Sequence, residues 1–575
     1  MTTVTHDDHE TWQRLALAAL RRVGRAPADA TPADVADLLA TTTYDGLTVR
    51  PLYRPETEAP PPVPGMRRGG LPWQVRQRYT EPDPAALRAD LAGGVTEVWL
   101  SGAAEDLLEE IDLGEVGVVL DEGCLDRLLD AARRHGVPAT ALTGNLGADP
   151  LAERARTGRP GDPERLVRLA AGCVAGLPGL RAVTVDATVY HDAGGSPADV
   201  LACSIASGVE YLRLLTGAGL DVADAFGQLE FRYPVGTDLF ESVAVLRAAR
   251  RLWARVAREC GAPAAQRQHA VTSAAMLTAL SPWSNIMRTS VACTAAAVGG
   301  ADAVTVAAFD ELSPERGEPG RRLARNLQAV LREEAQLHRV ADPAAGSWYV
   351  ERHTEDLAGR AWSRFREIER AGGMGAALDG GLVAGRLAAT RRARAADLAR
   401  RQPPIVGVSR FVDPGPATLA GPATEPGLAG GLPVYRHAEP FERLRARADE
   451  HAATTGARPA VLLVGLGRAA SRTARLEFAA DLFGVAGIAT PTADGDPESV
   501  AAALAAAGTS VACLCGSDEA YADAEAFARA LNGAGATGVW LAGPPAGHAG
   551  VGGYLFDGCD VLDVLERALK ELGIA

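Results

Sequence analysis

Short apolar runs alternate with longer amphipathic segments through the middle of the chain. Between Pro84 and about Glu351, each run has the residues typical of strands and is followed by ten or more residues with helical spacing. The runs are VTEVWL, VGVVL, PATAL, RAVTVDA, QLEFRYPV, RQHAVTS and DAVTVAAFDE. This alternation predicts βαβ units around a parallel sheet. Seven or eight units in about 270 residues favour an α/β (β/α)8 TIM barrel with its active face at the carboxyl ends of the strands.

A second alternating pattern fills the last part of the chain. Here the strand-like runs AVLLVGLG, AGIATP, SVACLCG and GVWLAG are separated by amphipathic helical segments. The pattern predicts a smaller doubly wound, flavodoxin-like domain over residues 458–575. Two helical segments precede it and end near Arg401, so the barrel domain is expected at 84–400, and the Pro- and Gly-rich residues 401–457 are expected to form a linker.

The first 83 residues fit neither alternation. Apolar positions up to about Arg25 have helical spacing and predict an amphipathic helix, and the Pro-rich stretch from Tyr44 to Pro64 predicts an extended arm. We expect residues 1–83 to contact a partner protein, because an extended arm in a large protein usually lies on another surface.

Composition narrows the classes of function. The chain has 575 residues and a formal net charge of -14, which argues against nucleic acid as the main partner. The sequence contains neither a run of about 18 uncharged apolar residues nor a signal-peptide pattern, so a cytoplasmic location is expected. Eight cysteines without a CxxC pair indicate reduced thiols rather than a metal or redox centre.

Polar residues at the predicted strand ends are the candidates for chemistry. They are Tyr190 and His191, Glu230 and Arg232, Arg267 and His269, and Asp310 and Glu311. A histidine in such a place can act as an acid or donate a hydrogen bond to a substrate carbonyl, and the alternative is a structural hydrogen bond within the fold. HExxH and GxSxG motifs are absent, which argues against the corresponding hydrolases, and the loop VGLGRAASRTAR does not complete a GxGxxG nucleotide motif.

Several motifs together resemble the acyl-CoA mutase family of methylmalonyl-CoA mutase. The resemblance rests on RQHAVTSAAMLTALSPWSNIMRTSVACTAAAVGGADAVTVAAFDE at 267–311, RRLARNLQAVLREEAQLHRVADPAAGSWYVE at 321–351, PWQVRQR at 72–78 and FGQLEFRYPVGTDLFESVAVLRAARRLWA at 226–254. These motifs follow the family's order from the Pro-rich arm to the end of the chain. The resemblance implies a TIM barrel followed by a cobalamin-binding-type domain.

The last domain departs from the family at the cobalt-binding motif DxHxxG. Gly467, Ala469 and Arg472 stand where the motif has Asp, His and Gly. Ala469 replaces the histidine that coordinates cobalt, and a methyl group has no lone pair to donate. We therefore expect no cofactor-binding residue and no metal site in this chain.

The barrel keeps only part of the family's site. His269 matches the family's catalytic histidine, and the substrate-binding positions Arg76, Tyr190 and His191 are kept. Arg78 replaces a tyrosine that wedges the substrate, and Leu71 replaces an arginine that contacts coenzyme A. The kept residues are therefore interpreted as vestigial.

This pattern resembles the small, or beta, subunits of the family. The resemblance implies a heterodimer with a large, or alpha, catalytic subunit that binds adenosylcobalamin and converts (R)-methylmalonyl-CoA to succinyl-CoA. Two alternatives remain open. One is a competent acyl-CoA mutase of altered substrate range, and the other is a structural or acyl-CoA-binding protein outside the complex.

Overall fold

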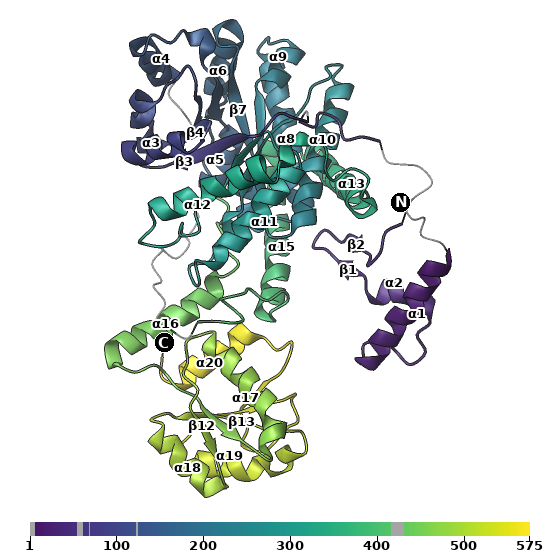
Figure 1. Cartoon of the computed structure of the whole chain (residues 1–575), viewed down its shortest axis with the longest axis vertical. Coiled ribbons are helices and arrows are strands. Elements are labelled where there is room, and N and C mark those ends of the chain that lie inside the picture. The colour runs from purple at the N-terminus through teal and green to yellow at the C-terminus, as the bar shows by residue number, and fades with distance from the viewer. Residues whose placement is uncertain are drawn as a thin grey trace.

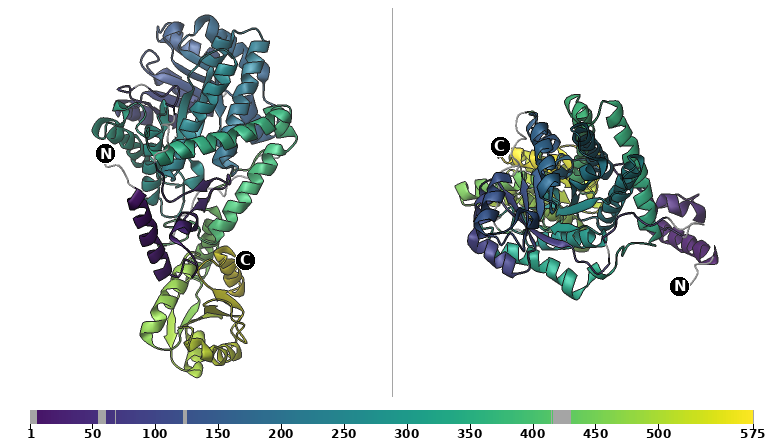
Figure 2. Two further views of the ribbon diagram at one scale, coloured as in Figure 1. Left: turned by 90° about the vertical axis from the view of Figure 1, so that its right-hand side faces the viewer. Right: turned by 90° about the horizontal axis from the view of Figure 1, so that it is seen from above.

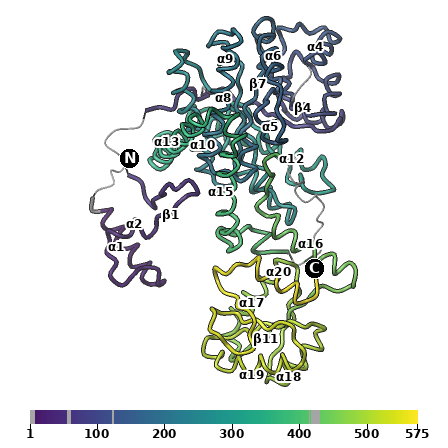
Figure 3. Tube along the Cα trace, turned by 180° about the vertical axis from the view of Figure 1, so that it is seen from behind, coloured from purple at the N-terminus to yellow at the C-terminus, as the bar shows by residue number. Residues whose placement is uncertain are grey.

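The chain folds into a barrel, a smaller α/β domain and an N-terminal segment (Figure 1). The structure is a computed structural model that describes residues 6–54, 61–67, 69–121, 125–413, 415 and 430–574. Figure 3 shows from behind that α15 (Leu382–Ala399) runs from the barrel toward the smaller domain.

Eight parallel strands close into a barrel, which confirms the predicted fold class. The first strand, β3, pairs with both β4 and the last strand, β10. The strands are β3 (Gln74–Tyr79), β4 (Glu97–Ser101), β5 (Gly117–Asp121), β6 (Gly144–Ala148), β7 (Leu180–Asp186), β8 (Leu229–Val235), β9 (Arg267–Thr272) and β10 (Ala303–Thr305).

Helices surround the barrel, and many begin at an Asp or Ser cap that is followed by proline. The carboxylates of Asp83, Asp149 and Asp162 each accept a backbone N–H of the helix that they start, which satisfies donors that the first turn leaves free. The helices are α3 (Pro84–Ala92), α4 (Leu125–Arg134), α5 (Pro150–Thr157), α6 (Pro163–Gly176), α7 (Thr188–Asp192), α8 (Pro197–Gly217), α9 (Val222–Gly227), α10 (Leu239–Glu259), α11 (Ser284–Val298), α12 (Glu318–Ala329), α13 (Trp348–Arg370) and α14 (Met374–Asp379).

One predicted domain boundary and one predicted strand differ from the structure. The barrel begins at Gln74, ten residues before the predicted boundary at 84, because β3 lies within the segment assigned to the arm. The run PATAL at 138–142 is not a strand: it holds the short 3-10 helix Ala139–Ala141, and the strand follows at β6. Gly144 and Gly147 have positive φ and lie against the backbone of β5, so β6 lacks the apolar pattern of a strand.

The C-terminal domain has a five-stranded parallel sheet in the order β12-β11-β13-β14-β15. This is the flavodoxin-like order 2-1-3-4-5 that the sequence predicts. Its strands are β11 (Leu462–Gly465), β12 (Thr492–Asp494), β13 (Val511–Cys515), β14 (Gly538–Ala542) and β15 (Gly553–Leu555), and its helices are α17 (Ala469–Gly484), α18 (Pro497–Ala506), α19 (Ala524–Gly533) and α20 (Val561–Glu571).

The predicted linker, 401–457, contains a helix of the C-terminal domain. Helix α16 (Glu439–Thr455) packs against α20, and its buried residues Phe441 and Leu444 belong to the same apolar core as Phe483 of α17. The C-terminal domain therefore extends about twenty residues further toward the N-terminus than predicted.

Helix α8 alone is long and apolar enough to be considered as a membrane span within the described residues. Two thirds of its most apolar window, 67%, is buried inside the protein. Its apolarity is therefore that of a core helix, which packs against α13 and β7 of the barrel domain.

The N-terminal segment has two parts. Helices α1 (His6–Arg22) and α2 (Val35–Leu38) pack on each other and stand apart from the barrel (Figure 2). The strands β1 (Thr41–Thr42) and β2 (Thr48–Val49) form a hairpin, and Asp45 at its tip is only 3% exposed. Residues 55–60 of the predicted arm lie outside the described residues.

The hairpin is fixed to the chain's own barrel. The Asp45 carboxylate accepts hydrogen bonds from Ser196 Oγ and, at 3.1 Å, from the N–H of Ala198 in the first turn of α8. It also pairs with Arg364 of α13, and Tyr44 donates a hydrogen bond of 3.0 Å to Asp397 of α15. At least this part of residues 1–83 therefore lies on its own subunit, and the partner contact stays a prediction for the rest.

Replacing Asp45 with alanine is expected to lower the free energy of unfolding by about 2 kcal/mol. The change removes the acceptor of the Ala198 N–H in the first turn of α8 and leaves the buried Ser196 hydroxyl and Arg364 with fewer partners. Urea unfolding measures the effect, and Asp29→Ala, an exposed aspartate after α1, is the control. Equal losses in the two variants would contradict this account of the hairpin.

Candidate functional site in the barrel

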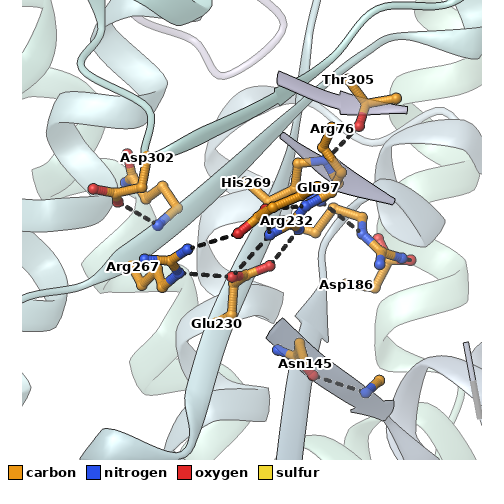
Figure 4. A network of polar contacts seen from close by, with 12 residues as sticks. Arg76, Glu97, Asn145, Asp186, Glu230, Arg232, Arg267, His269, Asp302 and Thr305 are labelled. Carbon is orange, nitrogen blue, oxygen red and sulfur yellow. Dashed lines mark hydrogen bonds and ion pairs between the residues drawn. The ribbon is translucent and has the colours of Figure 1, made fainter. Parts of the chain in front are cut away.

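Four charged side chains meet near the amino ends of four barrel strands (Figure 4). Arg76 of β3, which is fully buried, donates from Nε to Glu97 of β4 at 2.8 Å and from Nη1 to Glu230 of β8 at 2.5 Å. Arg267 of β9 donates from Nε to Glu230 at 2.9 Å. The two cations and two anions balance in charge, and we call Arg76, Glu97, Glu230 and Arg267 the ion cluster.

The arginines of the ion cluster hold Glu230 charged. Burial alone would raise the pKa of Glu230, but Arg76 and Arg267 hold it well below its usual value. Such a pair is costly to bury and still more costly to break, because one partner then remains charged and unpaired in the interior. The four side chains of the cluster are therefore held in place in the barrel interior.

A second layer, built around Trp99 of β4, lies next to the ion cluster. The guanidinium carbon of Arg232 lies 3.9 Å from the centre of the Trp99 ring, and that of Arg78 lies 4.5 Å from it. Arg232 is also paired with the buried Asp186 of β7 at 3.0 Å. Trp99 and Arg232 therefore fill the interior next to the cluster, while the outer arginine, Arg78, has a side chain that is 49% exposed.

His269, the predicted catalytic residue, is enclosed by this second layer. Its side chain has no exposed surface, and its ring meets that of Trp99 edge to face at 5.4 Å between centroids. Its Nδ1 accepts a hydrogen bond from Arg232 at 3.3 Å, since a guanidinium can only donate. Its Nε2 therefore carries the proton and donates to Thr305 Oγ1 at 2.8 Å.

Both ring nitrogens of His269 are thus used inside the protein. Burial and the charges of Arg76 and Arg232 hold the pKa of His269 well below its usual value, so the ring is neutral. A neutral imidazole with both nitrogens engaged and no exposed surface has no donor left for a substrate carbonyl. Its geometry matches the structural alternative that the sequence left open.

The other predicted residues fall into two groups. Arg76 lies beside His269 in the barrel interior, whereas Tyr190 and His191 lie on α7, beyond the carboxyl end of β7. Tyr190 is buried with its hydroxyl 3.4 Å from Ser207 Oγ. His191 Nε2 lies 2.7 Å from Ser273 Oγ, and burial with the charge of Arg394 lowers its pKa to about 3.

Trp99, Asp186 and Thr305 did not stand out in the sequence. The sequence holds a signal for Trp99, since it stands two residues after Glu97, as His269 stands two residues after Arg267. Residues at that spacing share one face of a strand, and a large or polar pair on the inner face predicts a filled barrel.

The carboxyl ends of the C-terminal sheet are the second candidate site. Ala469 begins α17, and no group of His, Cys, Asp or Glu side chains suited to a metal occurs among the described residues. Arg472 lies across this edge, donating to the carbonyl of Gly465 at 3.1 Å and pairing with Asp494 of β12 at 2.5 Å. Arg475 donates to the carbonyl of Ala542, at the end of β14.

These residues do not fit adenosylcobalamin. A doubly wound domain binds its ligand beyond the carboxyl ends of its strands, and two arginines with protein partners already lie there. The position of the cobalt ligand holds the methyl group of Ala469.

Comparison with known proteins decides the family. The family model described as Methylmalonyl-CoA mutase matches residues 99–426. The chain is 48% identical to the methylmalonyl-CoA mutase small subunit of Streptomyces virginiae, over 99% of this chain and 97% of that protein. The chain belongs to the methylmalonyl-CoA mutase family.

Two further relatives show how far the similarity extends. Identity to the methylmalonyl-CoA mutase small subunit of Propionibacterium freudenreichii subsp. shermanii is 35%, over 98% of this chain and 95% of that protein. Identity to the methylmalonyl-CoA mutase of Escherichia coli is 30%, over 70% of this chain and 63% of that protein. The predicted membership of this isomerase family is confirmed, and the chain matches proteins named small subunits along nearly their whole length.

Replacing Glu230 with glutamine is expected to lower the free energy of unfolding by about 3 kcal/mol. The change removes the negative charge that balances Arg76 and Arg267 in the barrel interior. Urea unfolding at neutral pH gives the value.

The matched control is Glu110→Gln, which removes a carboxylate paired with Arg88 at the surface. It should cost less than about 1 kcal/mol, because water screens an exposed pair. If both variants lost the same small amount, the ion cluster would not hold the barrel interior together.

Proposed function

We propose that this chain is the small, non-catalytic subunit of a methylmalonyl-CoA mutase. It forms a heterodimer with a large subunit that binds adenosylcobalamin and isomerises (R)-methylmalonyl-CoA to succinyl-CoA. The observation that carries the proposal is the enclosure of His269 between Trp99, Arg232 and Thr305. This enclosure supports a structural rather than a catalytic role for the family's site residue.

The barrel interior supports this proposal as a whole. An acyl-CoA mutase needs an open, dry space in which the substrate meets the cofactor. Here the ion cluster and the Trp99 layer occupy the interior: Arg76, Trp99, Glu230, Arg232 and His269 are buried, whereas the side chains of Arg267 and Arg78 are 33% and 49% exposed. Arg78, which stands where the family has a tyrosine next to the substrate, lies on Trp99 instead.

The C-terminal domain supports the assignment of the cofactor to the partner. Ala469 offers no lone pair to cobalt, and Arg472 lies across the strand ends. The domain keeps the flavodoxin-like sheet while its ligand edge is closed by the protein's own side chains.

The N-terminal helices α1 and α2 are the proposed partner contact within residues 1–83. They stand away from the barrel (Figure 2). Leu15 of α1 is 59% exposed, Val23 directly after α1 is 64% exposed, and Leu38 of α2 is 37% exposed. Apolar side chains on a projecting element are suited to burial in a permanent interface, which would exceed about 2,000 Å² in total.

The cysteines support a cytoplasmic location. The seven cysteines among the described residues are free, as suits a reducing compartment such as the cytoplasm.

The experiment compares the chain alone, the large subunit of the same genome alone, and the two co-expressed. We expect a one-to-one complex with mutase turnover in the presence of adenosylcobalamin. We expect the isolated chain to show no turnover and to retain no corrin absorbance after gel filtration. Turnover or corrin binding by the isolated chain would overturn the proposal, and so would failure of the two chains to associate.

A further inference from the structure

A cavity of about 340 Å³ lies where the barrel, the segment after α15 and the start of α16 meet. The first turns of α11 form one wall and Pro403–Val406 form the opposite one. Met287 and Val406, which are 74% and 53% exposed, stand at its mouth. Its lining shares no residue with the ion cluster, with the layer around Trp99 or with the carboxyl ends of the C-terminal sheet.

The walls are mainly apolar and carry few polar groups. Met276, Val291, Leu398 and Ile405 supply much of the lining. Among the described residues that line the cavity, Arg288 of α11 has the only full charge at neutral pH. An apolar cavity with a few convergent polar groups at a junction between domains is the usual form of a small-molecule site.

Arg288 lacks a counter-ion. Its guanidinium donates to Thr278 Oγ1 at 3.0 Å, to Asn285 Oδ1 at 2.8 Å and to the carbonyl of Val406 at 2.7 Å, which are all neutral acceptors. No carboxylate of the described residues lies within ion-pair distance of it. The nearby Glu442 is already paired with Arg436 at 2.8 Å.

This arrangement leaves donors of Arg288 for a ligand. A guanidinium has five N–H bonds, and the three hydrogen bonds of Arg288 use only Nη1 and Nη2, so its single Nε–H makes none to the described residues. A half-buried cation that is surrounded by neutral oxygens gains most from an anion, since a charge-assisted hydrogen bond is roughly twice as strong as a neutral one. The three neutral partners meanwhile hold the guanidinium plane in one orientation at the cavity wall.

His437 adds a neutral polar group to the lining. Its backbone N–H donates to the carbonyl of Ala275 at 3.0 Å, which fixes the residue at the start of α16. Burial and the charge of Arg394 lower the pKa of His437 to about 3. The ring is therefore uncharged near pH 7, and Arg288 remains the single charge among the described lining residues.

We propose that this cavity binds a small aliphatic monocarboxylate, with its carboxylate on Arg288 and its chain between α11 and Pro403–Val406. A single cation matches one negative charge, whereas a dianion would leave a charge unpaired among apolar walls. An apolar cavity of about 150 Å³ holds one benzene ring, so a space of about 340 Å³ suits a chain of roughly ten non-hydrogen atoms. The site does not depend on the subunit role proposed above.

The test is isothermal titration calorimetry of the full chain at pH 7.5 with sodium octanoate. Octan-1-ol is the matched neutral probe, because it has the same chain without the charge. We expect saturable binding of one octanoate per chain with a dissociation constant below about 1 mM, and binding of octan-1-ol at least tenfold weaker. Failure of octanoate to saturate, or equal binding of acid and alcohol, would overturn the proposal.

Two variants locate the site. Arg288→Gln removes the charge and should weaken octanoate binding at least tenfold, whereas Arg392→Gln, at an exposed arginine of α15, should leave it unchanged. Val291→Phe fills the cavity from a position that is 37% exposed, so the fold should tolerate it while octanoate binding falls. Unchanged affinity in Arg288→Gln or Val291→Phe, with thermal unfolding like that of the parent chain, would place any octanoate elsewhere and contradict the proposal.

Discussion

The ion cluster of Arg76, Glu97, Glu230 and Arg267 determines what the rest of the barrel can do. These side chains come from four strands, and their contacts with one another leave the barrel interior filled and neutral in charge. Next to the cluster lies the layer of Trp99, Arg232 and His269. Each of these side chains contacts the other two, and these contacts orient it. His269 is consequently held by protein groups alone.

Under the proposed function, this arrangement explains how a barrel can keep its fold without a catalytic role. A TIM barrel requires a filled interior, and layers of inward side chains supply it. In a catalytic mutase part of that space must remain open for the substrate. Here arginine and tryptophan side chains fill it, and retained residues such as Arg76 have structural partners. The C-terminal domain likewise keeps its five-stranded sheet, and Arg472 lies across the carboxyl ends of the strands, where a ligand would bind.

The sequence predicts the order of the domains well because hydrophobic periodicity is a local property. It misses β3 because the inward positions of QVRQRY are charged, which hides the apolar pattern of a strand. It also misses α16, because the helix follows a Pro- and Gly-rich stretch and begins with Glu439-Pro440. Kept motif residues such as His269 are found from the sequence, but their surroundings are not. The decisive contacts join residues far apart in the chain, for instance Arg76 with Glu230.

The central claim is that the family's site residues in this chain are structural. The most direct measurement is the mutase turnover of the assembled heterodimer when this subunit carries His191→Ala or His269→Gln, with the one-to-one complex verified by gel filtration. The account predicts a kcat and KM within about twofold of the parent complex for both variants. A drop of tenfold or more in an intact complex would contradict it, because these residues would then take part in catalysis.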